Sequence, residues 1–147
     1  MKSIKWVLVV SVGLVLFACL REDTGRADLS GSVTHVRDGD TIEVSGVPVR
    51  LSGLTCDERN TSRGASATRA VTNLVNGQAL SCTLTGEKSY DREVGRCRLP
   101  DGRDIGTELI LARECGRCER YDPEGTYIAP QKMAGPYNGV IPKYCRV

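Results

Sequence analysis

Acidic and basic side chains suited to phosphate chemistry gather in one short stretch, residues 36–58. It reads VRDGDTIEVSGVPVRLSGLTCDE. Carboxylates hold divalent cations and activate water, whereas guanidinium groups bind phosphate oxygens in pairs. The stretch therefore predicts a metal-assisted phosphoryl-transfer site. The alternative is a solvated barrel rim, in which Asp38 and Asp40 are turn acids. In that case Arg50 is a surface residue paired with Glu43 across neighbouring strands.

Strand-like patterns flank these residues and would position them. Apolar residues alternate with polar ones in several short runs, and Asp38-Gly39 and Asn76-Gly77 are turn or stop signals. Asp104 is suited to cap a helix. We expect strands at residues 31–36, 41–44, 47–54, 79–85 and 92–99, and helices at 58–76 and 104–113. This order predicts a β-rich α+β fold, a five-stranded OB-fold barrel with two to three helices that disulfides staple together.

The first 19 residues have the pattern of a secretory signal peptide. Lys2 and Lys5 precede 15 residues without charge, which is shorter than the roughly 20 residues of a membrane-spanning helix. The sequence that ends at Cys19 is similar to a bacterial lipoprotein cleavage box, with Cys19 as the lipidated residue. Ordinary cleavage nearby, such as after Ala27, is the alternative. Both predict an exported protein that is periplasmic, anchored to a membrane or secreted.

The rest of the chain divides into three segments by composition. Residues 20–30 are polar and charged and are expected to form a tether. Residues 31–113 carry the strand and helix patterns of the predicted domain. Residues 114–147 contain four prolines, which exclude a long helix, and three cysteines. We expect this last segment to be a cysteine-linked extension.

Six cysteines follow Cys19, and an even number in an exported chain indicates disulfides. Fifteen pairings are possible. Position along the chain favours Cys82–Cys97, because they fall on neighbouring strands, together with Cys118–Cys145 and Cys56–Cys115. Cys115 and Cys118 also have the spacing of a redox motif or half a zinc site. The chain has one histidine and no expected βαβ context, so structural disulfides are favoured.

The charge balance excludes a strongly basic nucleic-acid binder. The whole chain has 20 basic and 18 acidic residues. Lys2 and Lys5 are the basic residues before Cys19, so 18 of each sign remain. An anionic substrate must therefore be held by local arginines rather than by the overall charge.

The sequence resembles the staphylococcal nuclease (thermonuclease) family over residues 31–113. The resemblance rests on several motifs in order: Asp38-Gly-Asp-Thr41, Val49-Arg-Leu51, Gly53-Leu54, Glu58, Tyr90 to Arg92 and Asp104-Ile-Gly106. It implies an OB-fold barrel and calcium-dependent hydrolysis of nucleic-acid phosphodiesters. We expect a monomer that acts on DNA or RNA.

The resemblance also implies a role for each matched residue. Asp40 corresponds to a calcium-binding carboxylate, and Glu58 to the acid that positions or activates the attacking water. Arg50 and Arg92 correspond to the two phosphate-binding arginines. In another register Arg96 takes the place of Arg92. Cys56 would offer its backbone carbonyl to the metal.

The sequence departs from the family pattern at the second calcium ligand. Thr55 stands where an aspartate is expected, so the metal site loses one negative charge. In an extended segment Asp57 would point to the same side as Thr55, so its carboxylate could replace the missing metal ligand. The alternative function is therefore an inactive or weakened OB-fold module that binds nucleic acid, glycan or protein. His35 is expected to be a strand surface residue.

Overall fold

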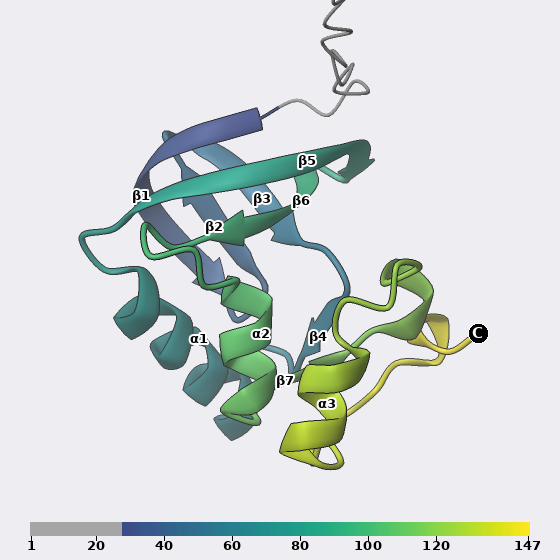
Figure 1. Ribbon diagram of the computed structural model, residues 1–147. Coiled ribbons are helices and arrows are strands. Elements are labelled where there is room, and N and C mark those ends of the chain that lie inside the picture. Colours follow the sequence, from purple (N-terminus) through teal and green to yellow (C-terminus); the bar gives the residue numbers. More distant parts are fainter. Residues whose placement is uncertain (1–27) are drawn as a thin grey trace, which may run out of the picture.

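The computed structural model describes residues 28–147 of the chain (Figure 1). The predicted signal peptide, most of the predicted tether and the candidate lipidation site Cys19 lie outside the described residues. Within residues 28–147, no helix is long and apolar enough to cross a membrane.

Five strands pair in a ring, in the order β1-β2-β3-β6-β5, and so form a closed barrel. The pairs are antiparallel except for β3 with β6, which is parallel. The first strand begins earlier than expected, because Asp28, Leu29 and Ser30 pair with β5 instead of belonging to the tether. The strands are β1 (Asp28–Asp38), β2 (Thr41–Val44), β3 (Val47–Leu51), β5 (Ala79–Ser89) and β6 (Arg92–Arg98).

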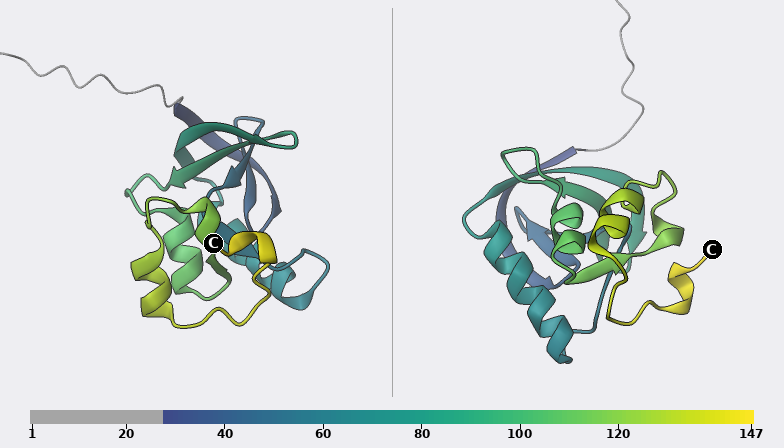
Figure 2. Two further views of the ribbon diagram at one scale, coloured as in Figure 1. Left: turned by 90° about the vertical axis from the view of Figure 1, so that its right-hand side faces the viewer. Right: turned by 60° about the horizontal axis from the view of Figure 1, so that its bottom comes forward.

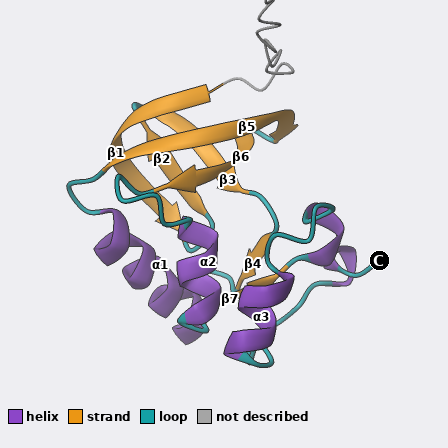
Figure 3. Ribbon diagram, viewed as in Figure 1, coloured by secondary structure: helices purple, strands orange, loops and turns teal. Residues whose placement is uncertain are grey.

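Alternation along the strands fills the barrel with apolar side chains, because successive residues point to opposite faces. The buried residues include Ile42, Val44, Val49, Leu51, Leu80 and Leu84. Figure 3 shows the helices gathered at one end of the strands. They are α1 (Ser62–Val75), α2 (Ile105–Leu111) and α3 (Ile128–Ala134). The α+β class, the five strands and the helix between the third and fourth barrel strands are confirmed.

Two of the helices, α1 and α2, begin directly after capping residues. Thr61 accepts a hydrogen bond from the Gly64 amide, so α1 begins four residues later than the expected Glu58. Asp104 accepts one from the Thr107 amide, which confirms Asp104 as the cap of α2. Each cap satisfies an amide that lacks a partner within the helix.

The strand expected at residues 47–54 is two strands. β3 ends at Leu51, and β4 (Leu54–Cys56) leaves the barrel to pair with β7 (Cys115–Arg117). Gly53 makes the bend with a φ of 76°, a region that favours glycine. A Cβ at Gly53 would lie 2.8 Å from the Tyr127 ring. The residues after 113 thus pack directly against the strand that follows the barrel.

All three predicted disulfides are confirmed. They join Cys56 to Cys115, Cys82 to Cys97 and Cys118 to Cys145. Cys115 and Cys118 therefore pair with different cysteines, and neither a redox pair nor a zinc site forms between them. His35 lies exposed on β1, as predicted.

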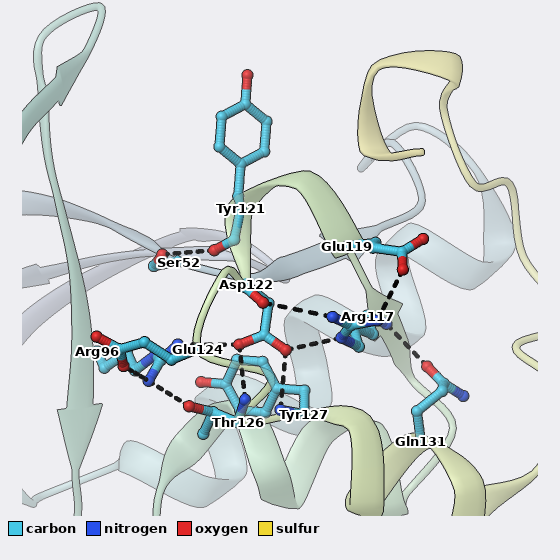
Figure 4. A network of polar contacts seen from close by, with 10 residues as sticks. All are labelled: Ser52, Arg96, Arg117, Glu119, Tyr121, Asp122, Glu124, Thr126, Tyr127 and Gln131. Carbon is cyan, nitrogen blue, oxygen red and sulfur yellow. Dashed lines mark hydrogen bonds and ion pairs between the residues drawn. The ribbon is translucent and has the colours of Figure 1, made fainter. Parts of the chain in front are cut away.

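A buried ion cluster fixes the segment that follows β7 to the barrel (Figure 4). The side chain of Asp122 is fully buried, and its carboxylate pairs with Arg96 at 3.0 Å and Arg117 at 2.7 Å. It also accepts hydrogen bonds from the amides of Thr126 and Tyr127. Arg96 belongs to this cluster, so it is engaged in holding the fold together.

We predict that Asp122→Ala lowers the free energy of unfolding by about 3–5 kcal/mol, because two partly buried guanidinium groups and two backbone amides lose the buried carboxylate that they share. Urea denaturation measures the loss. Asp101→Ala is the matched control, because Asp101 forms an exposed ion pair with Arg103. That change should cost less than about 1 kcal/mol. Equal losses for the two variants would show that the cluster does not stabilise the fold.

Candidate active site

A hollow of about 280 Å³ brings together five of the six site residues that the sequence predicts. The turn after β1, strand β3, the end of β4, the loop after β4 and the start of β6 supply them. These five residues are Asp40, Arg50, Cys56, Glu58 and Arg92. Asp38, Asp57, Arg59 and Tyr144 line the same hollow.

The carboxylate of Asp40 connects the two arginines. Its Oδ2 lies 3.1 Å from Nη2 of Arg50. Its Oδ1 accepts a hydrogen bond from the hydroxyl of Thr41 at 3.1 Å. The same hydroxyl accepts one from Nη1 of Arg92 at 2.9 Å. Asp40 and Thr41 therefore hold the guanidinium groups of β3 and β6 in the same hollow.

Backbone and side-chain oxygens fix the two guanidinium groups further. Arg50 donates to the carbonyls of Leu51 at 2.6 Å and Leu54 at 2.9 Å. Arg92 donates to the carbonyl and the hydroxyl of Ser89. An arginine has five N–H donors, so each side chain keeps donors for a phosphate beyond the three contacts described.

The barrel register explains this arrangement. Thr41 of β2 pairs with Arg50 of β3, and Ser89 pairs with Arg92 across the β5–β6 hairpin. The suggested pair between Arg50 and Glu43 is wrong: Glu43 pairs with Nε of Arg37 at 2.8 Å.

Thr55 is the one predicted site residue that does not line the hollow. Its residue surface is 2% exposed, and it lies in β4 opposite Gly116. Cys56 is bonded to Cys115, so its sulfur is not free to bind a metal. Glu58 is exposed at the edge of the hollow.

Asp57 lines the hollow but also holds the C-terminal segment. Its Oδ1 accepts hydrogen bonds from the Tyr137 hydroxyl at 3.1 Å and the Val140 amide at 2.7 Å. The hypothesis that Asp57 replaces the missing metal ligand therefore competes with a second role for the same oxygen.

The fit of a divalent cation depends on Asp38 and Asp40. Burial and the neighbouring Asp38 raise the pKa of Asp40 to about 6, although Arg50 acts in the opposite direction. Burial is the largest of these effects, so the carboxylate of Asp40 loses its proton less readily than a carboxylate in water. Among residues 28–147, however, no three acidic, histidine or cysteine side chains cluster closely enough to hold a metal. The donors fit a cation that keeps much of its water, and not one enclosed by side chains.

A second hollow of about 350 Å³ adjoins the first and shares Arg50, Arg92 and Tyr144 with it. Tyr90 and Tyr121 line it as well. Tyr90 lies within a motif of the sequence, whereas sequence patterns predicted no role for Tyr121 or Tyr144 and did not reveal the bridging role of Thr41. The DGDT motif carries a signal for Thr41, whereas no spacing in the sequence places Tyr144 beside Arg50.

No protein-family model matches the chain. A protein of Escherichia coli with the name "uncharacterized endonuclease" is 30% identical over 102 residues, which cover 67% of each chain. A protein of the same name from Escherichia coli O157:H7 matches equally well. The succinoglycan biosynthesis protein ExoI of Rhizobium meliloti (strain 1021) is 32% identical over 138 residues, 84% of this chain and 71% of that protein.

We predict that the titration of Asp40 makes the protein less stable as the pH rises. The folded-state pKa of about 6 lies above the ordinary value of about 4. The contribution is therefore fully present below pH 4 and is lost as the pH rises through 6. Between pH 4 and 7.5, the free energy of unfolding should fall by about 2–3 kcal/mol more in the wild type than in Asp40→Asn.

Urea denaturation of both proteins in the presence of a chelator measures this difference. The chelator matters because a bound cation would stabilise the ionised carboxylate. Identical pH dependence of the two proteins would show that Asp40 ionises normally.

Proposed function

This chain belongs to the family of the Escherichia coli proteins named uncharacterized endonucleases, and from that premise we propose that it hydrolyses phosphodiester bonds of nucleic acids. One observation carries the proposal beyond the names of its relatives. Two arginines from different strands meet in one hollow, joined through Asp40 and Thr41. Paired guanidinium groups suit the oxygens of a phosphodiester and the extra charge of its transition state.

Glu58 completes the chemistry. In hydrolysis a water oxygen forms a bond to phosphorus, and the bond from phosphorus to one ester oxygen breaks. Glu58 lies at the edge of the same hollow and would accept the proton that the water loses. Arg50 and Arg92 would hold the non-bridging oxygens while negative charge builds on them. The departing oxygen takes up a proton from the surrounding water and leaves as an alcohol.

Calcium is the cofactor that we propose for this site. Asp38 and Asp40 would hold it, with the backbone carbonyl of Cys56 as a further candidate. A bound divalent cation would polarise the phosphate and favour ionisation of water. Because Thr55 supplies no carboxylate and lies outside the hollow, we expect weak binding that depends on the substrate as well.

The finer assignment that we propose is an OB-fold nuclease of the thermonuclease type. The closed five-stranded barrel with a helix between its third and fourth strands agrees with it. We further propose that the protein is exported, which is consistent with three disulfides in a domain of this size. The lipid anchor at Cys19 and the monomeric state remain proposals from the sequence.

A second candidate function is binding of nucleic acid without cleavage. The small number of clustered carboxylates among residues 28–147 and the neutral, buried Thr55 favour it. Both candidates use the same arginines for phosphate. They differ in whether the bound phosphodiester is cut.

We predict that Arg50→Ala lowers kcat for hydrolysis of single-stranded DNA by about 100-fold or more, because it removes a donor to the charged transition state. Arg92→Ala should have a similar effect. Arg69→Ala is the matched control, since Arg69 is exposed on α1 and lines neither hollow. Oligonucleotide cleavage measures the rates, and thermal melting checks folding. Undiminished cleavage by the folded Arg50 variant would refute the assigned role.

Thr41 is a positioning residue, and we predict that Thr41→Val lowers kcat by about tenfold or more because Arg92 loses the hydroxyl that fixes it. Thr41→Ser keeps a hydroxyl and should retain most of the activity. A structural effect alone would change the melting temperature of both variants without separating their values of kcat. If valine and serine support equal rates, the contact from Thr41 to Arg92 does not position the catalytic group.

A further inference from the structure

The segment after α3, residues 137–145, is held at both of its ends. At the first, the Tyr137 hydroxyl and the Val140 amide donate to Asp57. At the second, Cys145 is bonded to Cys118, and both cysteines are buried. In both views of Figure 2 the yellow C-terminal segment leaves the helices and runs along the outside of the molecule.

The first anchor requires a close approach of the backbone to Asp57. A Cβ at Gly139 would lie 2.4 Å from the Asp57 Oδ1 atom, so a larger residue would displace the segment. The anchor therefore depends on a glycine as well as on the carboxylate. Asp57 itself lines the phosphate hollow, which places the start of the segment at the site.

The second anchor places two tyrosines at the site. Tyr144 precedes Cys145 in η2 (Lys143–Cys145), and Tyr121 ends η1 (Glu119–Tyr121), which follows Cys118. Their ring centroids lie 6.4 Å apart, with the planes inclined by 59°. The Cys118–Cys145 bond thus joins the two short helices that carry these rings.

Tyr144 is the one tyrosine of residues 28–147 that lines both hollows. It is 53% exposed, whereas Tyr127, which packs in the core, is 1% exposed. Packing within the fold accounts for Tyr127 but leaves about half of Tyr144 open to solvent. An exposed aromatic ring beside a phosphate site offers a face on which a nucleobase can stack.

We propose that Tyr144 is a specificity-determining residue that stacks a base of an unpaired nucleotide next to the phosphate held by Arg50 and Arg92. The Cys118–Cys145 disulfide positions it. The inference rests on the proposed function and names the substrate class as single-stranded nucleic acid. A paired base in a duplex is stacked on its neighbours, so its face is not available to the ring.

Binding without cleavage tests the stacking directly. The probes are two fluorescent deoxyoligonucleotides of equal length, one with bases and one made of abasic sites, measured by anisotropy in the presence of a chelator. Both carry the same phosphates. We expect the wild type to prefer the base-containing probe by about tenfold, and Tyr144→Ala to lose this preference. Tyr144→Phe keeps the ring and should keep the preference. Met133→Ala, an exposed residue outside both hollows, is the matched control.

Replacement of both cysteines tests the positioning role. We expect Tyr144→Ala and the Cys118→Ser/Cys145→Ser variant each to raise KM for single-stranded DNA by about tenfold, with kcat changed less than about twofold. If the double variant fails to fold, the comparison of Tyr144→Ala with Tyr144→Phe still decides the role of the ring.

The outcomes separate this inference from the proposed function. A wild type that binds neither probe overturns both. A wild type that binds both probes equally overturns the stacking role while it leaves phosphate recognition in place. Retention of the base preference by Tyr144→Ala likewise overturns the inference alone. Loss of the preference in Tyr144→Ala, with retention in Tyr144→Phe and Met133→Ala, supports it.

Discussion

The candidate site depends on the contacts that the carboxylate of Asp40 makes. It binds Arg50 directly and reaches Arg92 through the Thr41 hydroxyl, so one anion orients both guanidinium groups. Without it, two cations would face one another in a partly buried hollow. The barrel makes the contact possible, because the register that pairs Thr41 with Arg50 brings the turn after β1 to strand β3. The geometry of the site therefore depends on the strand pairing that closes the barrel.

In this protein, charged groups near the candidate site, and not the overall charge, would bind an anionic substrate. The chain is nearly neutral beyond its first residues, yet the hollow concentrates acidic and basic groups. The acids divide their work: Asp40 orients the arginines, while Asp57 anchors the C-terminal segment. Asp122 performs a similar structural task farther along the chain, where it holds Arg96 and Arg117. The carboxylates that remain for a metal are consequently few, which fits a cation site that binds weakly on its own.

Local patterns in the sequence were sufficient to predict most helices and strands and most residues of the candidate site. The DGDT turn and the following strand placed Asp40 and Arg50 together because hairpin register is set over short distances. Strand order likewise predicted the Cys82–Cys97 bond, whereas position along the chain only favoured the other two pairs among several possible ones. The bend at Gly53 and the pairing of β4 with β7 depend on packing between distant segments, which periodicity does not encode. The same limit explains why Tyr144 and the Asp57 anchor were missed, since Tyr137 lies 80 residues from Asp57 along the chain and Tyr144 lies still farther from Arg50.

Hydrolysis of single-stranded DNA and RNA by the oxidised domain, with calcium and with chelator, tests the central claim most directly. We predict cleavage of at least one of them in calcium and none in chelator, with binding retained in both. Cleavage would establish that two carboxylates and a hydrated cation suffice beside the paired arginines. Binding without cleavage in either condition would contradict the nuclease assignment and favour a nucleic-acid-binding module. Absence of both binding and cleavage would contradict the assignment of the hollow as a phosphodiester site.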